Sequence, residues 1–427
     1  MKKLSVITFI VLAFVTLSCN KDNRVAEPDD TIPVENLIPR KDIELTRSQA
    51  EYVKTGGNEF ALNLFKEVAG DENMVISPLS VMFALGMADN GASGNTKAEI
   101  EKVLGYGEES VEGLNSFCKT MMESAQEIDP STTIEFANAA VINSSIGKLK
   151  EEYKSTIETN YSAEVCNMEF GKDPVKDLIN SWCEQKTHGM IPELLKEEPT
   201  PLDFAHLLNA VYFKGIWSSQ FKKENSRKED FHGIDRKKHK VNMMHQEAVF
   251  DLGFLPNTCT ALKLPYGNQA FNMVFILPDD ESTEGFNKLK ESLDLNLWNN
   301  LSDTFGGIKV DVKIPSFETT FGSGLKENLK QLGIVNAFNP QKAQFGLMAD
   351  VSGILYIDKV LHKAKITVNE QGSEAAAVTD VIIGWIGSSG KPAQEFKTVF
   401  HADRPFIYAI TEVSTGAILF IGQYTGI

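Results

Sequence analysis

Between Ser373 and Ile383 the chain alternates between two kinds of position. One parity holds only small or apolar uncharged side chains, whereas both charged residues, Glu374 and Asp380, fall on the other parity. Because side chains of a strand point alternately to its two faces, this pattern predicts a strand with one buried face. A shift of one residue would bury both carboxylates, so only one register in a sheet is favourable. The uncharged positions are Ser373, Ala375, Ala377, Thr379, Val381 and Ile383.

The segment that follows, 384–394, is rich in glycine and serine and contains a proline. Such a composition predicts a solvent-exposed loop. Exposed loops of this kind are preferred sites of proteolysis. From the residues alone, the alternative is an ordinary hairpin with an alanine-rich strand.

Helical periodicity dominates the early chain, and short β-branched or aromatic runs dominate the later part. Apolar spacing predicts helices over 58–68 and 77–90, with Ser77 as the N-cap of the second helix and Pro78 in its first turn. Helices first and long antiparallel strands later predict an α+β fold with a large, mostly antiparallel central sheet. The predicted strands lie within 206–217, 261–280, 308–318 and 416–424.

The N-terminus carries the features of an export signal. Residues 1–18 combine lysines with an apolar run shorter than the roughly 20 residues that span a bilayer, which is typical of a signal peptide. Cys19 follows in a pattern that resembles a lipobox, although Leu17 stands one place closer to the cysteine than is usual. We expect Cys19 to be the lipidated end of an outer-membrane lipoprotein that faces the periplasm or the exterior. The alternative is a plain secretory signal.

The stretch after the signal peptide, 19–45, is rich in charge and proline and lacks periodicity. This composition predicts a disordered tether, which at this length reaches on the order of 25–30 Å. Residues 46–427 show no linker, internal repeat or low-complexity block, and no further run long enough to span a membrane. We therefore expect them to form one large domain.

Charge and motifs exclude several functions. The net charge of −16 argues against nucleic-acid binding, which depends on cations that meet phosphates, and the basic cluster 236–240 indicates a solvated hairpin. No local catalytic motif occurs, which argues against an enzyme. Neither a metal nor a cofactor is expected, because the remaining cysteines lack metal-ligand spacing, and their disulfide state stays open. These cysteines are Cys118, Cys166, Cys183 and Cys259.

Several blocks of the chain, in the same order, resemble the serpin family of serine protease inhibitors. The resemblance covers 58–427 and implies the serpin fold, with a large central sheet, helices and an exposed reactive-centre loop. That loop coincides with the alternating segment and the glycine-rich stretch after it. Together with Cys19, the chain is similar to lipoprotein-type serpins of bacteria. The blocks are 73–100, 207–217, 241–246, 262–280, 325–345, 362–379 and 401–423.

For function, the resemblance implies an irreversible suicide-substrate inhibitor. A serine endopeptidase, with cysteine endopeptidases as a second class, cleaves the loop and becomes acyl-linked to it. The freed strand then inserts into the sheet and displaces the protease. The resemblance implies that the hinge of this movement is formed by Glu370, Gly372, Ser373, Glu374, Ala375, Ala376, Ala377 and Val378.

The resemblance also implies a group of residues at the place where the sheet opens. Taken alone, each of them is an ordinary buried polar or packing residue. The implied residues are Ser77, Ser80, Asn209, Trp217 and His362.

Counted from Gly372 at the family's spacing, the cleaved bond falls between Ile386 and Gly387, with Trp385 as the alternative. These apolar residues imply target proteases of elastase, subtilisin or chymotrypsin type. A shift toward Lys391 is opposed by the proline after it, which would hinder acyl transfer. We expect a monomer that meets a membrane through its lipid and binds no nucleic acid. The alternatives are a non-inhibitory serpin that acts as a surface binding protein and a hydrolase with a dispersed triad.

Overall fold

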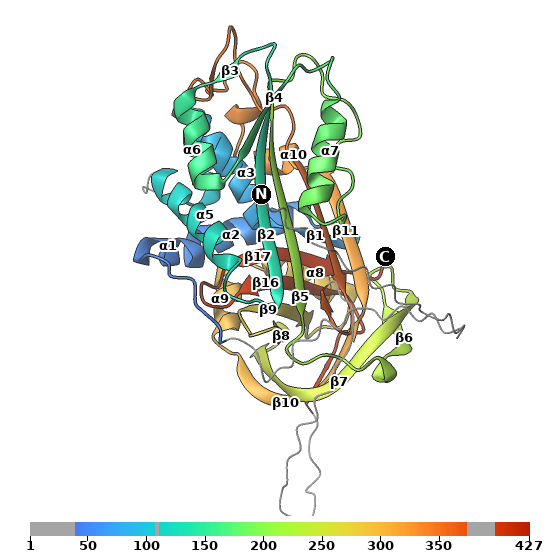
Figure 1. The fold of residues 1–427 in the computed structure, drawn as a ribbon. Coiled ribbons are helices and arrows are strands. Elements are labelled where there is room, and N and C mark those ends of the chain that lie inside the picture. Colours follow the sequence, from blue (N-terminus) through green and yellow to red (C-terminus); the bar gives the residue numbers. More distant parts are fainter. Residues whose placement is uncertain (1–38, 107–110, 374–397) are drawn as a thin grey trace, which may run out of the picture.

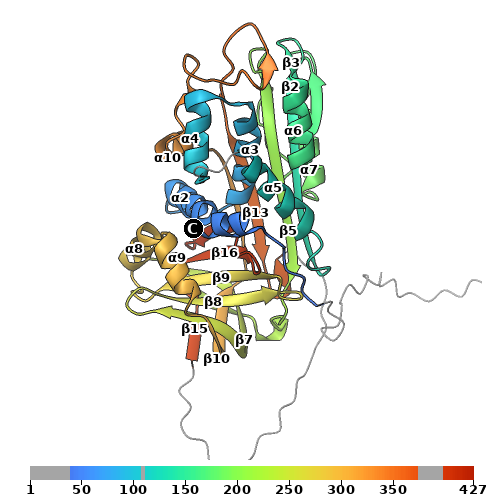
Figure 2. The same cartoon turned by 90° about the vertical axis from the view of Figure 1, so that its left-hand side faces the viewer.

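The computed structural model describes residues 39–106, 111–373 and 398–427. The predicted signal peptide, Cys19 and the segments 374–378 and 385–387 lie outside this described part. The long strands of one sheet run through most of the length of the molecule, and a second sheet lies across its lower half (Figures 1 and 2). The α+β class predicted from the sequence is confirmed.

The helices lie mostly in the first half of the chain, as the apolar spacing predicts. Helix α2 has the predicted bounds, and α3 begins directly after Ser77, whose hydroxyl accepts a hydrogen bond from the Ser80 backbone nitrogen at 3.3 Å. This bond satisfies one of the free amide groups at the helix start. The α-helices are α1 Arg47–Tyr52, α2 Asn58–Val68, α3 Pro78–Gly91, α4 Gly94–Leu104, α5 Val111–Ala125, α6 Glu151–Tyr161, α7 Val175–Lys186, α8 Thr283–Ser292, α9 Leu295–Ser302 and α10 Lys326–Leu332; shorter helical turns are η2 Val53–Gly57, η3 Lys223–Asn225 and η4 Asn336–Phe338.

The strands form two large sheets and one small sheet. The orders are β11-β13-β14-β5-β2-β4, β1-β17-β16-β9-β8-β7-β10-β15 with β6 joined to β7, and β12-β3. In the described part, only the pairs β2–β4 and β10–β15 are parallel, so the mostly antiparallel character is confirmed. The bounds are β1 Met74–Ile76, β2 Thr132–Asn143, β3 Lys148–Leu149, β4 Glu164–Met168, β5 Ala205–Ile216, β6 Arg227–His232, β7 Lys238–Leu255, β8 Cys259–Tyr266, β9 Phe271–Pro278, β10 Gly306–Pro315, β11 Phe317–Gly324, β12 Ala349–Asp350, β13 Leu361–Val368, β14 Gly372–Ser373, β15 Thr398–His401, β16 Phe406–Glu412 and β17 Ile418–Tyr424.

One hydrophobic core extends across both large sheets. Helix α3 packs against β5 of the six-stranded sheet and against β17 of the nine-stranded sheet, and nearly all of its residues are buried. On β11, Phe317 packs its ring against Phe406, Tyr408 and Tyr424 of the other sheet, at centroid distances of 5.9, 5.2 and 4.9 Å. These aromatic contacts hold the two large sheets together.

The basic cluster 236–240 lies in and just after the turn between β6 and β7. The ammonium groups of Lys238 and Lys240 lie 3.3 and 2.6 Å from the carboxylate of Asp230 on the neighbouring strand. Both lysines are largely exposed. The cluster is therefore a solvated hairpin with its own carboxylate partners, as the sequence predicts.

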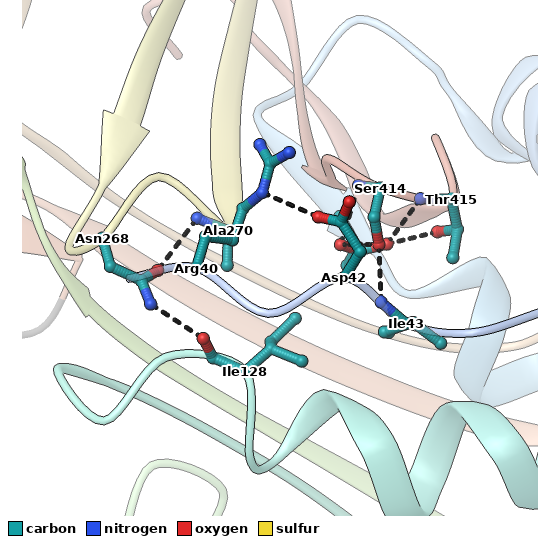
Figure 3. Close-up of polar contacts among 9 residues, drawn as sticks. Arg40, Asp42, Ile43, Ile128, Asn268, Ala270, Ser414 and Thr415 are labelled. Atoms are coloured by element: carbon teal, nitrogen blue, oxygen red, sulfur yellow. Dashed lines mark hydrogen bonds and ion pairs between the residues drawn. The ribbon is translucent and has the colours of Figure 1, made fainter. Parts of the chain in front are cut away.

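The last residues of the predicted tether contact the domain. Ile43 is 6% exposed, and its backbone nitrogen donates to the Ser414 hydroxyl at 2.9 Å (Figure 3). Just before it, Arg40 and Asp42 form a side-chain ion pair at 2.9 Å. The polar composition of the stretch concealed one apolar anchor, because burial of a single isoleucine leaves no periodic pattern.

The described residues contain neither a helix long and apolar enough to cross a bilayer nor a group of three potential metal ligands. The four cysteines that the structure describes are free thiols, so it contains no disulfide among them. Burial raises the pKa of Cys183 to about 11 and that of Cys259 to about 12. Both thiols therefore stay protonated and poorly reactive near neutral pH.

Candidate functional site

The six-stranded sheet is divided between β5 and β13, and the two-residue strand β14 bridges them at one end. Gly372 and Ser373 pair with Ile216 and Gly215 of β5, and Ser373 also pairs with Val368 of β13. Apart from this bridge, no strand pair in the described part joins β5 to β13. Each strand therefore presents a backbone edge that one additional strand can occupy.

Ser373 faces the core at the entrance to this opening. Its side chain is 1% exposed, and its hydroxyl shares a 2.7 Å hydrogen bond with the Tyr266 hydroxyl. Tyr266 stacks on Trp217 with ring centroids 4.4 Å apart, and the Trp217 indole nitrogen donates to the Asn369 carbonyl at 2.9 Å. The parity predicted to be buried is thus buried at its first position. The rest of the predicted hinge, Glu374, Ala375, Ala376, Ala377 and Val378, lies outside the described residues.

Gly372 permits the close approach of β14 to β5. Its φ is 156°, and a Cβ atom at this position would lie 2.0 Å from the carbonyl oxygen of Gly215. Any other residue would push the two strands apart. Glycine is therefore required for the bridge.

The chain before β14 is anchored by Glu370. Its Oε1 accepts hydrogen bonds from the Ser226 hydroxyl at 2.7 Å and from the Asn242 amide at 2.9 Å, and its carbonyl oxygen accepts from the Phe221 nitrogen at 2.9 Å. Partial burial acts to raise the pKa of Glu370, but these hydrogen bonds outweigh it, so the pKa lies below its usual value. These contacts anchor the chain at Glu370, directly before β14.

Four of the predicted residues meet beneath the opening. The Ser77 backbone nitrogen donates to His362 Nε2 at 3.1 Å, and the Ser80 hydroxyl donates to the side-chain carbonyl of Asn209. The Asn209 amide in turn donates to Asn138 at 2.7 Å. The start of α3, the middle of β5 and the start of β13 are thus linked by exchangeable polar contacts directly below the open edges.

A cavity of about 250 Å³ lies between α3 and the separated strands. Its walls combine apolar and polar groups and include small side chains of the helix, which leave room for additional side chains. The lining residues that matter here are Ala84, Leu85, Leu207, Asn209, Val360 and His362.

His362 is held in its neutral form. The side chain is 6% exposed, and burial lowers its pKa to about 4. Only a neutral imidazole can accept the hydrogen bond from Ser77, so geometry and burial agree. The polar cluster beneath the opening is therefore uncharged at neutral pH.

Two contributors to this site were missed from the sequence. Asn138 is 1% exposed and donates to the Tyr161 carbonyl at 2.7 Å, so it ties the cluster to α6. A polar residue within the mostly apolar run of β2 was the available signal. Tyr266 had no such signal, because its partner Ser373 lies 107 residues away in the chain.

The geometry defines a class of protein whose main sheet is open between two of its long strands, apart from a two-residue bridge at one end. Comparisons with known proteins give the same answer. A family model described as Serpin (serine protease inhibitor) matches residues 55–427. Human leukocyte elastase inhibitor is 31% identical over 386 residues, which cover 88% of this chain and 99% of the relative. The chain therefore belongs to the serpin family.

Solved structures support the fold assignment. The thermophilic serpin tengpin in its native state matches with a TM-score of 0.79 at 30% identity, covering 91% of this chain and 97% of that chain. Thyroxine-binding globulin in complex with thyroxine matches with a TM-score of 0.75 at 25% identity, covering 87% and 98%. The serpin fold expected from the sequence is confirmed.

The buried imidazole predicts an acid-dependent loss of stability. Between the ordinary histidine pKa near 6.5 and the folded value of about 4, only the unfolded chain binds the proton, so stability falls as the pH falls through this window. We expect acidification from about pH 7 to about pH 4.5 to lower the free energy of unfolding by up to ~3 kcal/mol through His362. The His362→Gln variant should not show this loss. Urea unfolding of both proteins across the range measures the difference.

As the pH falls, Asp89 changes the stability in the opposite direction. The parent must therefore be compared with the His362→Gln variant at each pH. Burial raises its pKa to about 6, so it adds stability as the pH falls from about 6 toward 4. This contribution is common to the parent and the variant and cancels in their difference. Identical pH dependence of the two proteins would contradict the role assigned to His362.

Proposed function

We propose that the protein is an irreversible inhibitor of serine endopeptidases, with cysteine endopeptidases as a second class, and that it acts by cleavage-triggered insertion of its own chain between β5 and β13. The observation that carries this proposal is β14, which already occupies the first two positions of the missing strand. The open edges of β5 and β13, with the cavity below them, provide the remaining space for an inserted strand.

The register of β14 supports the proposal when it is continued along the chain. Because β14 is antiparallel to β5 and β13, each residue after Ser373 would lie opposite a residue one position earlier in both neighbouring strands. Thr379 would then lie opposite both Asn209 and His362, within the polar cluster. Its hydroxyl is a suitable partner for groups that exchange hydrogen bonds as the strands part.

The same register explains the alternation of small and apolar side chains. Ala375 would lie opposite Phe213, which is 7% exposed, where a larger side chain would meet a filled core. Val381 would lie opposite Leu207 and Val360, which line the cavity. The strand therefore places small residues where the core is full and larger apolar ones where it is open.

Insertion also supplies the movement that inhibition needs. The chain from Ser373 to Ile386, laid out as a strand at ~3.3 Å per residue, carries its end roughly 43 Å from the entrance. A protease joined to that end by an acyl bond would be moved by a comparable distance. Displacement and compression of the enzyme would then leave the acyl bond unhydrolysed.

We place the cleaved bond at Ile386–Gly387, with Trp385 as the alternative, and infer targets of elastase, subtilisin or chymotrypsin type. Human leukocyte elastase inhibitor, one of the relatives, is named for an elastase. Apolar side chains before the bond suit proteases with hydrophobic specificity pockets. We expect the inhibitor itself to act as a monomer.

A non-inhibitory role as a surface binding protein is the second candidate. It is favoured by one observation, the structural similarity to thyroxine-binding globulin, whose structure holds thyroxine. Incubation with serine proteases of each specificity separates the candidates. An inhibitor gives a covalent complex that survives denaturing electrophoresis, whereas a binding protein is only cut.

We also propose that Cys19 anchors the protein to an outer membrane through a lipid, on the basis of the signal-like residues before it. The stretch after Cys19 would then hold the domain close to the membrane surface.

Ser373→Arg is expected to convert the inhibitor into a substrate. The change would put a charge on a side chain that is 1% exposed, and an unpaired buried charge costs several kcal/mol, so insertion should stall. Electrophoresis after reaction with an elastase-type protease should show cleaved chain and no covalent complex. The matched control is Glu374→Arg, the same new residue on the face predicted to stay outside, which should still form the complex. Normal complex formation by Ser373→Arg would refute insertion.

Ile386→Arg is expected to move inhibition from elastase-type to trypsin-type proteases, because a cation before the cut fits an anionic specificity pocket. Second-order inhibition rates with one protease of each type measure the change, and Lys391→Ala serves as the control that should change neither rate. Mass spectrometry of the parent complex locates the joined residue. A protease joined through Lys391 would show that the register is wrong.

Cys19→Ala is expected to release the protein from the membrane fraction, because the acyl chains that anchor it would be absent. Cys166→Ala, which removes a half-buried thiol within the domain, should leave membrane association unchanged. Fractionation followed by immunoblotting measures both. Membrane retention of Cys19→Ala equal to that of the parent would refute lipid anchoring.

A further inference from the structure

The cavity between α3 and the separated strands is lined from both faces of the six-stranded sheet. Leu207 and Asn209 of β5 lie on the face that α3 covers, since Asn209 contacts Ser80. His206 lies on the opposite face with Leu208, which packs against residues of α7. Because all of these residues line one cavity, it passes through the opening between β5 and β13.

The cavity opens to solvent beside exposed apolar side chains. Leu202, Ile354 and Tyr356 line it and are 88%, 54% and 44% exposed. Large apolar side chains left exposed beside a cavity are typical of ligand-binding grooves. One wall, 351–360, contains neither helix nor strand and joins β12 to β13, at the end of the molecule that carries β3 (Figure 2). A small apolar molecule can therefore reach the cavity from solvent.

His206 supplies the cavity wall with a polar atom that has no partner. Its Nε2 atom is buried and makes no hydrogen bond within the described residues. Its ring centroid lies 5.7 Å from that of Phe170, so one side of the imidazole is packed. A buried ring nitrogen without a partner is costly, and a ligand that bonds to it gains affinity.

The groups around His206 favour a neutral ligand. Burial lowers the pKa of His206, Lys359 lowers it further, and Asp203 and Asp358 act in the opposite direction without restoring the usual value. Asp203 and Asp358 are balanced by Lys359 and by Lys326, whose ammonium lies 3.7 Å from Asp358, so no net charge attracts an ion. A neutral imidazole nitrogen donates or accepts according to its tautomer, and a hydroxyl group can pair with either form.

The volume of the cavity sets the size of the ligand. It measures about 250 Å³. An engineered apolar cavity of roughly 150 Å³ holds benzene, and the same proportion gives about ten non-hydrogen atoms here. A bicyclic aromatic alcohol has this size, with a flat apolar body and one hydroxyl group.

We propose that the cavity between β5 and β13 is a binding site for small, neutral aromatic alcohols, whose rings lie among the apolar side chains of the walls and whose hydroxyl group bonds to His206 Nε2. The bound molecule would occupy the space below the open edges. Under the proposed function, on which this consequence alone rests, the ligand would obstruct strand insertion.

Two probes of nearly equal shape test the site, 2-naphthol and 2-methylnaphthalene, which exchange a hydroxyl for a methyl group. Titration followed by naphthyl fluorescence should show that the parent binds 2-naphthol at least about fivefold more tightly, because only this probe bonds to His206. His206→Phe, which keeps a ring against Phe170, should lose the preference. The matched control His239→Phe, in the β6–β7 hairpin, should keep it.

Three results of these titrations would overturn the proposal. They are the absence of saturable binding of 2-naphthol, a preference for 2-naphthol that persists in His206→Phe, and tighter binding of the anion 2-naphthoate than of 2-naphthol by the parent.

Nuclear magnetic resonance of the parent, isotope-labelled in its histidines, locates the ligand without any substitution. The ring signals of His206 and His362, which both line the cavity, should shift on addition of 2-naphthol. The signal of His239 should not. A shift at His239 with none at His206 would also overturn the proposal.

Rates of covalent complex formation give the functional readout. With saturating 2-naphthol the parent should react several-fold more slowly with an elastase-type protease, whose own activity on a small substrate is measured beside it. If the protein without ligand forms no complex with any protease, the inhibitory function fails while the titrations still decide the site. If 2-naphthol binds and the rate is unchanged, the obstruction is refuted and the binding site stands.

Discussion

Two unpaired backbone edges, those of β5 and β13, are the constraint on which the rest of the structure depends. A buried amide or carbonyl group without a partner is costly, so a sheet that is open in its interior is poised to accept a strand. Here β14 fills only two residue positions between the edges of β5 and β13. The next described strand of the chain, β15, belongs to the other large sheet.

The residues around the opening fit this constraint in different ways. Gly372 lets the chain lie close to β5, Glu370 anchors the chain just before it, and Ser373 is held by its hydrogen bond to Tyr266. Beneath the edges, neutral His362 and the Ser80–Asn209 contact provide polar groups whose partners can change without leaving a buried charge. Under the proposed function, stability would be withheld from the sheet where the protein needs a conformational change.

The sequence predicted the helices and strands better than it predicted the opening between β5 and β13. Period-two alternation marked Ser373 as a buried position, and an N-cap serine before a proline located the start of α3, because both signals are local. The separation of β5 from β13 has no such signal, since strand pairing involves backbone atoms that every residue shares. The anchor at Ile43 and the partner hydroxyl of Tyr266 were missed for a related reason, because each depends on a contact distant in the chain.

The central claim is that the structure is incomplete until its own chain enters the sheet. The most direct measurement is thermal unfolding of the intact protein beside protein cut once within 384–394 by a protease that it does not trap. Completion of the sheet adds backbone hydrogen bonds and buried apolar side chains together, so the cut protein should unfold at a much higher temperature than the intact protein. Equal unfolding temperatures, or a lower one after cleavage, would contradict the account.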